Sequence, residues 1–458
     1  MFYFLLARLF PEWQWPEVSE FTWALKNSFI QATGSSFVAV GAGLFLLLGL
    51  LRLPMRIRAL FSWALLTPSF FPPLFLLLSF MSWIQPFPMG WIGIVLIQGF
   101  MNAGLISVLL LQVVEAQLAG LSEAALVMGA GRGLFLRHCA SLVFPEILSL
   151  GLFVFAVSFA SFSIPLVVGG GNSTNIEILI FEKIKISAQW GQALSLSVIQ
   201  LLIVVGFMFL PKSTWRREVG RAVDLRAWGS SVCLAVVGAY LMMFWAPLVV
   251  HLSSGVSAIN SMPGLWDEIL ELLVPSLLVA FFVGLFCLCL FLFFALGFPE
   301  NRVPSFLRGW LAPSTALLGF AFLFFSDKNI WFSYVFALTL IFFPIIYRLG
   351  MDRGLESLTG QIEIARTLGA NDLLIWRRIL IPQVWSLACI LSGVASLWAL
   401  GEFALGRMIL GGPKTLALLS QSLLASYRID AGLGVGTLIL LCGSLMFLFF
   451  WGGTRVGR

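Results

Sequence analysis

The sequence predicts an all-α integral membrane protein, and three observations support this fold class. Of the 458 residues, 60% are hydrophobic and only 10% are charged, whereas soluble domains average about 25% charged residues. Several apolar runs reach the roughly 20 residues that a helix needs to span the hydrocarbon core. Lys and Arg gather in alternate loops between these runs, which is typical of the cytoplasmic side of multi-pass membrane proteins. No run has the short alternating pattern of a membrane-barrel strand.

We expect a transmembrane helix in each sufficiently long apolar segment. In chain order these segments are 28–51, 60–83, 90–114, 143–163, 193–210, 229–252, 271–297, 309–326, 331–349, 384–405 and 432–452. The loops that carry most of the 27 Lys and Arg residues are expected on the cytoplasmic side of a bacterial inner membrane. This distribution accounts for the net charge of +6 with membrane lipid as the surroundings and no nucleic-acid partner.

The second half of the chain repeats features of the first half at a nearly constant distance. A Glu-Ala-Gly pattern occurs twice, 240 residues apart, and a Gly-Gly pair follows each copy. Because an even number of predicted spans separates the two copies, both are expected on the same side of the membrane. The halves are then parallel repeats, related by an axis along the membrane normal. The repeated residues are Glu123, Ala125 and Gly129 with Glu363, Ala365 and Gly369, and Gly170–Gly171 with Gly411–Gly412.

The repeat divides the chain into four parts. Residues 1–27 form a short N-terminal segment, interpreted as the remnant of a first helix, and residues 28–211 form the first domain. Residues 212–228 are a basic cytoplasmic linker, and residues 229–458 form the second domain. The counterpart of the span at 229–252 would mostly precede Met1. We therefore expect eleven transmembrane helices with an outside N-terminus, or twelve if the true start lies upstream.

The second Glu-Ala-Gly loop is predicted to be a short helix between two turns. Thr359 is expected to cap this helix, and Gly369 is expected to end it in the left-handed conformation. Asn371 or Asp372 then caps the next helix, which re-enters the membrane near Pro382.

The first loop has the same opening but a different ending. Residues 123–125 read Glu-Ala-Ala, and Gly129 follows at the same spacing. Leu142 stands where the second loop has its proline, and Pro145 comes three residues later. We therefore expect the helix after the first loop to begin about one turn further along the chain.

Both loops resemble the EAA loop of ABC-importer permeases, which has the pattern E-A-A-x-x-x-G with a proline further on. The stretches around Ser161–Pro165 and Gly401–Phe403 also resemble the fused permeases of the iron(III) and thiamine type. The matching loop residues are Glu123, Ala124, Ala125 and Gly129 in the first loop, and Glu363, Ala365, Gly369 and Pro382 in the second, where Ile364 replaces the middle alanine.

The resemblance implies the MetI-like permease fold of type I ABC importers, with two fused domains. It implies that each loop forms a coupling helix for one of two copies of an ABC ATPase subunit, on which ATP is bound and hydrolysed. It also implies a periplasmic or lipoprotein substrate-binding protein that delivers a small solute, with iron(III) or thiamine-like cargo favoured. This chain is then a transport subunit, with no enzymatic activity and no cofactor of its own.

Polar residues within or beside the spans are the candidates for a translocation path. We select Glu402 with its counterpart Ser161, together with Gln98 and Asn102. Each has a structural alternative, a hydrogen bond between helices. No metal site is expected, because the chain has two histidines and no CxxC pair. The segment 411–415 departs from the phosphate-binding loop pattern, because Pro413 occupies the position of the second glycine.

Three other functions fit the sequence less well. A secondary transporter coupled to an ion gradient is the main alternative, but it normally couples through ionisable groups inside the membrane, which are sparse here. A membrane enzyme would need a cluster of nucleophiles, acids or metal ligands, and the sequence indicates none. A structural scaffold gives no reason for the repeated loops.

Overall fold

The computed structural model describes residues 13–208 except 72, residues 225–296, residues 318 and 322, and residues 329–455 except 352, 353 and 356. These residues form helices joined by turns, and no strand occurs among them. The prediction of an all-α fold is confirmed for this part of the chain.

The described helices fall into two series. The first comprises α2 (Val18–Leu51), α3 (Met55–Phe70), α4 (Pro73–Trp83), α5 (Trp91–Gln117), α6 (Ala119–Val127), α7 (Arg132–Phe159), α8 (Ser163–Val168), α9 (Ile176–Lys185) and α10 (Trp190–Met208). The second comprises α11 (Ser231–Asn260), α12 (Leu265–Leu296), α15 (Ile330–Ile346), α17 (Thr359–Thr367), α18 (Asp372–Ile375), α19 (Ile381–Leu400), α20 (Ala404–Ile409), α21 (Leu416–Ala425) and α22 (Ile429–Gly452). Short 3₁₀ turns lie at η2 (Arg226–Trp228) and η5 (Gly453–Arg455), and π-helical turns at η3 (Tyr347–Met351) and η4 (Trp376–Leu380).

The two series repeat the same elements at the offset that the sequence indicates. Helices α6 and α17 have equal lengths, as do helices α9 and α21, and the two helices of each pair begin at equivalent positions of the repeat. The Ser28 Oγ atom on α2 accepts a hydrogen bond of 2.9 Å from the first main-chain N–H of α9. The Ser276 Oγ atom on α12 accepts the equivalent bond from the first N–H of α21, also at 2.9 Å. Helices α2 and α12 therefore hold equivalent places.

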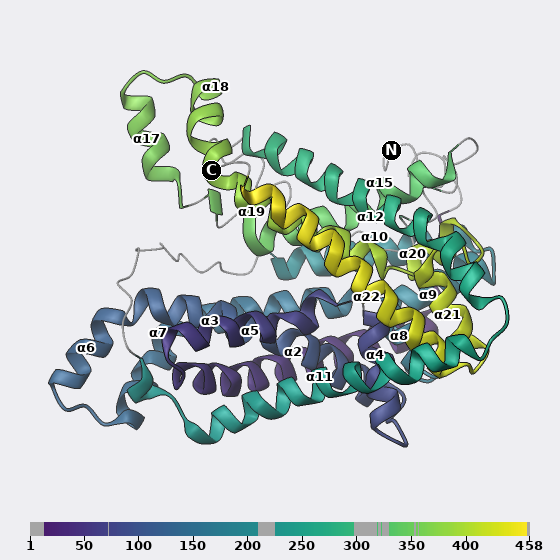
Figure 1. Cartoon of the computed structure of the whole chain (residues 1–458), viewed down its shortest axis with the longest axis horizontal. Coiled ribbons are helices and arrows are strands. Elements are labelled where there is room, and N and C mark those ends of the chain that lie inside the picture. The colour runs from purple at the N-terminus through teal and green to yellow at the C-terminus, as the bar shows by residue number, and fades with distance from the viewer. Residues whose placement is uncertain are drawn as a thin grey trace.

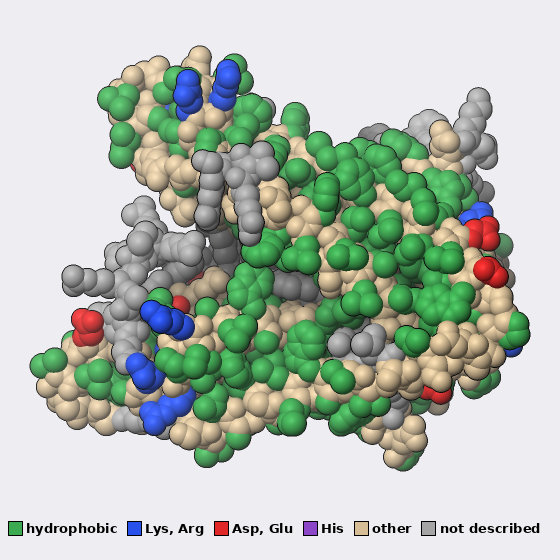
Figure 2. Space-filling model, in the orientation of Figure 1, with side chains coloured by type: hydrophobic (Ala, Val, Ile, Leu, Met, Phe, Trp, Pro, Cys, Tyr) green, Lys and Arg blue, Asp and Glu red, His purple; other side chains and the backbone are tan. Residues whose placement is uncertain are grey.

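Six of the described helices are long and apolar enough to cross a membrane. They cover Val18–Leu51, Trp91–Glu115, Gly133–Phe159, Leu265–Ala295, Asp372–Leu400 and Ile429–Gly452, and shorter apolar helices lie at Trp190–Val204, Ser231–Pro247, Ile330–Ile346 and Leu416–Ala425. On the face seen in Figure 2, charged side chains gather mainly at the two ends and hydrophobic ones cover the middle. The membrane character is thereby supported, while eleven or twelve helices stays a prediction. The expected span 309–326 lies outside the described residues, apart from 318 and 322.

The expected span at 60–83 is not one continuous helix, because two helices, α3 and α4, occupy it. Phe71 ends α3 in extended backbone with φ −77° and ψ 151°. It precedes a proline, which disfavours the helical conformation of the residue before it. Pro73 then begins α4, where the missing N–H costs no helical hydrogen bond. The break brings the Phe71 ring onto that of Phe244 in α11, with the ring centroids 5.0 Å apart.

Helix α11 links the two halves. Its first turns pack against α2, where Gly49 meets Cys233, and its last turns pack against α22, where Gly255 meets Gly434. Helices α6 and α17 project from the same end of the molecule, on the left in Figure 1. The two Glu-Ala-Gly loops therefore lie on one side, as the repeat predicts.

Candidate functional site

The first candidate site is the pair of short helices α6 and α17. Position by position, residues 121–130 and 361–370 have the same sequence of buried, half-buried and exposed side chains. Only one position in each of these stretches is fully buried, Ser122 in α6 and Ile362 in α17. Both helices thus contact the rest of the protein at the same position, and the same face of each helix is exposed.

A left-handed glycine ends each of the two helices in the same way. Gly129 has φ +68° and Gly369 has φ +83°, a conformation that glycine adopts without steric cost. The Ala130 N–H donates to the Ala125 carbonyl at 2.9 Å, and the matching pair in the second loop joins residues 370 and 365 at 3.0 Å. This is the Schellman arrangement, which satisfies the last carbonyls of a helix. The predicted conformation of Gly369 is confirmed.

The starts of the neighbouring helices correct two sequence predictions. Leu358, one residue before Thr359, occupies the N-cap position of α17, and it makes no side-chain cap. Asn371 caps α18 as expected, because its Oδ1 atom accepts the Leu374 N–H at 2.8 Å. Helix α7 begins at Arg132, which is the position equivalent to the first residue of α18 in the repeat, so the predicted shift of one turn is wrong.

The two prolines beyond the loops explain why the shift does not occur. The glycine turn fixes where the next helix starts, and Pro145 is then accommodated inside α7. In the second half, Pro382 lies in the first turn of α19, directly after the π-helical turn η4. The difference in proline position therefore changes the helix interior rather than its beginning.

Apolar side chains are exposed at the outer ends of both helices. Met128 is 84% exposed and the equivalent Leu368 is 82% exposed. Val127 in the first loop and Ile364 in the second are also open to the surroundings. Exposed apolar clusters on projecting elements are typical of protein–protein contact sites.

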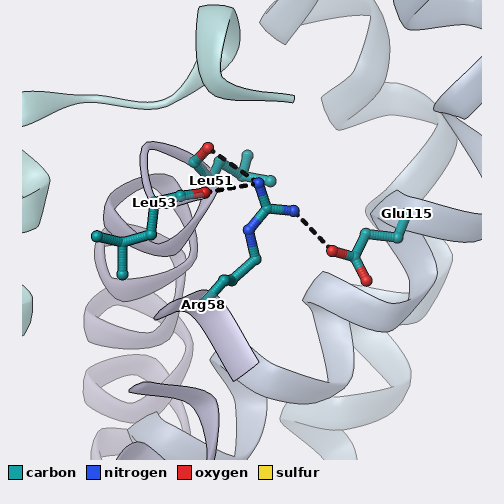
Figure 3. A network of polar contacts seen from close by, with 4 residues as sticks. All are labelled: Leu51, Leu53, Arg58 and Glu115. Atoms are coloured by element: carbon teal, nitrogen blue, oxygen red, sulfur yellow. Dashed lines mark hydrogen bonds and ion pairs between the residues drawn. The ribbon is translucent and has the colours of Figure 1, made fainter. Parts of the chain in front are cut away.

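A polar network lies directly before α6, in addition to the buried apolar residues Leu118, Phe135 and Trp228. Figure 3 shows Arg58 at the start of α3 with its guanidinium between three acceptors. It donates to Glu115 Oε1 at 2.7 Å and to the Leu53 and Leu51 carbonyls at 3.0 and 3.4 Å. The Arg58 side chain is 5% exposed and that of Glu115 is 39% exposed. This network joins the turn between α2 and α3 to the last turns of α5, directly before α6.

The contacts that support α17 are mainly apolar. Leu355 is the repeat equivalent of Glu115, and Ile362 and Ile375 are the equivalents of Ser122 and Phe135. All three aliphatic side chains are buried in the main hydrophobic core. The two short helices thus share their backbone geometry, while the residues at three equivalent supporting positions differ. One polar side-chain contact is also present at α17, where Gln383 Nε2 donates to Gln361 Oε1 at 2.6 Å.

The second candidate site is a cavity of about 190 Å³ between the two halves. It brings together two of the four predicted path residues, Asn102 and Glu402. Three pairs of its lining residues are equivalent, or nearly so, at the offset of the repeat. Its lining comprises Ser69, Phe71, Pro73, Met101, Asn102, Leu105, Phe153, Val157, Phe342, Ile345, Trp398 and Glu402, and the equivalent pairs are Asn102 with Phe342, Leu105 with Ile345, and Val157 with Trp398.

The carboxylate of Glu402 is held at the start of α20. Its Oε1 atom accepts hydrogen bonds from the Ala404 N–H at 2.9 Å and the Leu405 N–H at 3.2 Å. Its main-chain carbonyl accepts a bond of 2.9 Å from the Tyr334 hydroxyl. These two N–H donors fix one oxygen of the carboxylate in position, and Glu402 is among the residues that line the cavity.

The other predicted path residues lie elsewhere. The Gln98 side chain is buried between α2 and α5, where its Oε1 atom accepts the Ser35 hydroxyl at 2.8 Å. The Ser161 carbonyl accepts the Asn175 side-chain amide at 2.7 Å, beside α9. Neither residue lines the cavity. Asn102 does so, and its Nδ2 atom donates to the Gln98 carbonyl at 2.8 Å.

The glycine-rich segment 411–415 has a structural role in the described fold. Thr415 is the N-cap of α21, and its hydroxyl accepts the Leu418 N–H at 3.4 Å. Within the described part of the chain, no three His, Cys, Asp or Glu side chains are placed to share a metal ion. No family model, curated protein or solved structure matches the chain.

Proposed function

We propose that this chain is the membrane-spanning permease of an ATP-driven importer of the ABC type, located in a bacterial inner membrane. One observation supports this most strongly. Two short helices at equivalent positions of the repeat project from one end of the molecule with the same exposure and the same glycine turn. A pair of equivalent projecting helices fits a pair of identical partners, as two copies of an ATPase subunit would be.

In this proposal the exposed apolar ends of α6 and α17 enter a groove on each ATPase subunit. Leu118 alone separates α5 from α6, and the left-handed turn at Gly129 joins α6 to α7. Helices α5 and α7 contribute Asn102 and Phe153 to the cavity between the halves. A displacement of α6 is therefore transmitted to helices that line the cavity, and α17 acts likewise through α15 and α19.

The cavity is the proposed position of the cargo during transit. Its walls are aromatic and aliphatic, and Glu402 brings a carboxylate to them. A carboxylate in apolar surroundings favours a positively charged solute. Iron(III) or a thiamine-like compound, delivered by a periplasmic or lipoprotein binding protein, is the favoured cargo class, and ATP is used on the partner subunit.

The test is transport in proteoliposomes that contain the chain together with the ATPase subunits that co-purify with it. Solute uptake should require ATP on the side of the ATPase subunits and should stop with a non-hydrolysable ATP analogue. Uptake that follows an imposed ion gradient in the absence of ATP would contradict the proposal. That result would support the alternative, a secondary transporter.

A further inference from the structure

The end of the linker between the halves lies against α6. We call α6 and α17 the first and second docking helices, after the role proposed above. We call residues 225–230 the strap. The Trp228 side chain is 2% exposed, and its Nε1 atom donates to the Ser122 hydroxyl of α6 at 2.9 Å. Its ring stacks on Phe135 of α7, with the ring centroids 3.7 Å apart and the planes at 21°. Ser122 is the fully buried position in residues 121–130, so the strap holds α6 at the point where it meets the body.

The strap is also fixed to the end of α2. The Ser230 N–H donates to the Leu48 carbonyl at 2.9 Å, and Arg52 Nη1 donates to the Arg226 carbonyl at 3.2 Å. A side chain at Gly229 would collide with the main chain of residues 51 and 52, so glycine permits this close approach. The strap is therefore a closely packed segment rather than a loose connection.

The strap continues directly into α11, which reaches the second half. Ser230 is the N-cap of α11, and its hydroxyl accepts the Cys233 N–H at 3.4 Å. The far end of α11 packs on α22 at Gly255 and Gly434. A single helix, α11, thus connects α22 in the second half to the residues beneath α6 in the first half.

We propose that the strap is a positioning element that couples α6 to the second half through Trp228, so that the first docking helix follows movements of both halves. Helix α17 lacks this connection within the described residues, since aliphatic core residues stand at the positions of Ser122 and Phe135. This inference rests on the proposed function, because it assigns the strap a part in transmitting the ATPase movement.

The test uses Trp228→Phe, which keeps an aromatic ring and removes the donor, and Ser122→Ala, which removes the acceptor. The matched control is Trp385→Phe in the second half, which removes an indole hydrogen bond of the same length, 2.9 Å, to the Gly453 carbonyl. Each variant is measured with the ATPase subunits in proteoliposomes. Solute taken up per ATP hydrolysed should fall about fivefold in either strap variant, the factor that corresponds to one lost hydrogen bond, and should not change in the control.

A second readout separates positioning from general stability. A photoreactive amino acid replaces Val127 or its repeat equivalent Thr367, and cross-linking to the ATPase subunit is compared. In the Trp228→Phe background, cross-linking from position 127 should fall while that from position 367 is retained. Equal loss from both positions, or unchanged coupling in both strap variants, would overturn the proposal.

The proposed function fails in a distinguishable way. If the unaltered chain forms no cross-link to an ATPase subunit from either position, the function is wrong and the strap's role falls with it. The strap proposal alone is wrong under a different result. In that case the chain without strap substitutions cross-links from both positions, but the strap variants show the same coupling and cross-linking as the Trp385→Phe control.

Discussion

Helices α6 and α17 share one backbone geometry but differ in the residues that support them. Beside α6 lie an arginine–glutamate network and a tryptophan–serine hydrogen bond. At the equivalent positions α17 has aliphatic core residues, and one side-chain hydrogen bond joins Gln383 of α19 to Gln361 of α17. The geometry is preserved because it depends on few residues, namely an alanine whose carbonyl accepts the last bond and a left-handed glycine. The supporting residues can differ because any contact that fixes the one buried side chain, Ser122 or Ile362, is sufficient to hold the helix.

The open faces of the two helices also differ. Leu121, Leu126 and Val127 are exposed on α6, and their equivalents on α17 are Gln361, Arg366 and Thr367. Two identical partners would therefore meet a mainly apolar surface on one side and a more polar one on the other. If both helices bind ATPase subunits, as we propose, this difference predicts that the two contacts are unequal in strength and in salt dependence.

The largest expected effect comes from removing the shared geometry. Gly129→Arg combined with Gly369→Arg should lower ATP-driven uptake more than about tenfold, because an L-residue in the left-handed conformation costs about 1–2 kcal/mol and the arginine blocks the apolar end. Membrane insertion should be intact, since both positions have open space around them. Gly131→Arg is the control, because Gly131 has φ −66°. Uptake that persists in the double variant would contradict the docking role.

The next largest effect concerns the different side-chain contacts beside α6 and α17. Arg58→Met should lower stability by about 2 kcal/mol, because it leaves Glu115 and two carbonyls without their charged donor. Arg366→Met is the comparison in the second loop, where the ion pair to Asp372 at 2.9 Å joins side chains 41% and 58% exposed. That variant should change stability by less than about 0.5 kcal/mol. Thermal unfolding in detergent measures both, and equal shifts would show that the supports do not differ.

The cavity gives a smaller and more specific effect. Glu402→Gln keeps an oxygen that accepts the N–H groups of Ala404 and Leu405, and it removes the charge. Uptake of a cationic solute should fall about tenfold, or about 1.4 kcal/mol, with ATP hydrolysis retained. Ser161→Ala, the equivalent position in the first half, should leave uptake unchanged. Full uptake with Glu402→Gln would exclude the carboxylate from the path.

The smallest expected effect concerns the open faces. Leu126→Arg and Arg366→Leu exchange the residues at one equivalent position. Leu126→Arg should weaken ATPase binding by about 1 kcal/mol, because it removes apolar area that docking would bury. Arg366→Leu should instead reduce the salt dependence of binding. Titration of each variant with the ATPase subunit at low and high salt measures the affinity and its salt dependence. Identical changes in the two variants would mean that the two helix surfaces contribute to binding in the same way.

The sequence predicted the features that depend on local patterns. Apolar runs and basic loops indicated a helical membrane protein, and the Glu-Ala-Gly spacing located two helices that lie at one end of the molecule. The left-handed Gly369 and the Asn371 cap were also predictable, because turn and cap geometry is encoded within about four or five residues.

Long-range contacts were not predictable in the same way. Trp228 and Ser122 are 106 residues apart in the chain, and nothing local connects them. Phe342 and Trp398 in the cavity have the composition of ordinary core residues, although applying the repeat offset to Asn102 would have indicated Phe342. The break between α3 and α4 was not predicted, because the span at 60–83 was assigned from apolar content alone. Apolar content takes no account of the proline that follows Phe71.

We propose that α6 and α17 each bind one ATPase subunit. Native mass spectrometry of the complex purified in mild detergent tests this most directly. We expect two ATPase subunits for each copy of this chain, and fewer than two when Gly129 and Gly369 are both replaced by arginine. A chain that purifies without any ATPase subunit, or a double variant that retains both, would contradict it.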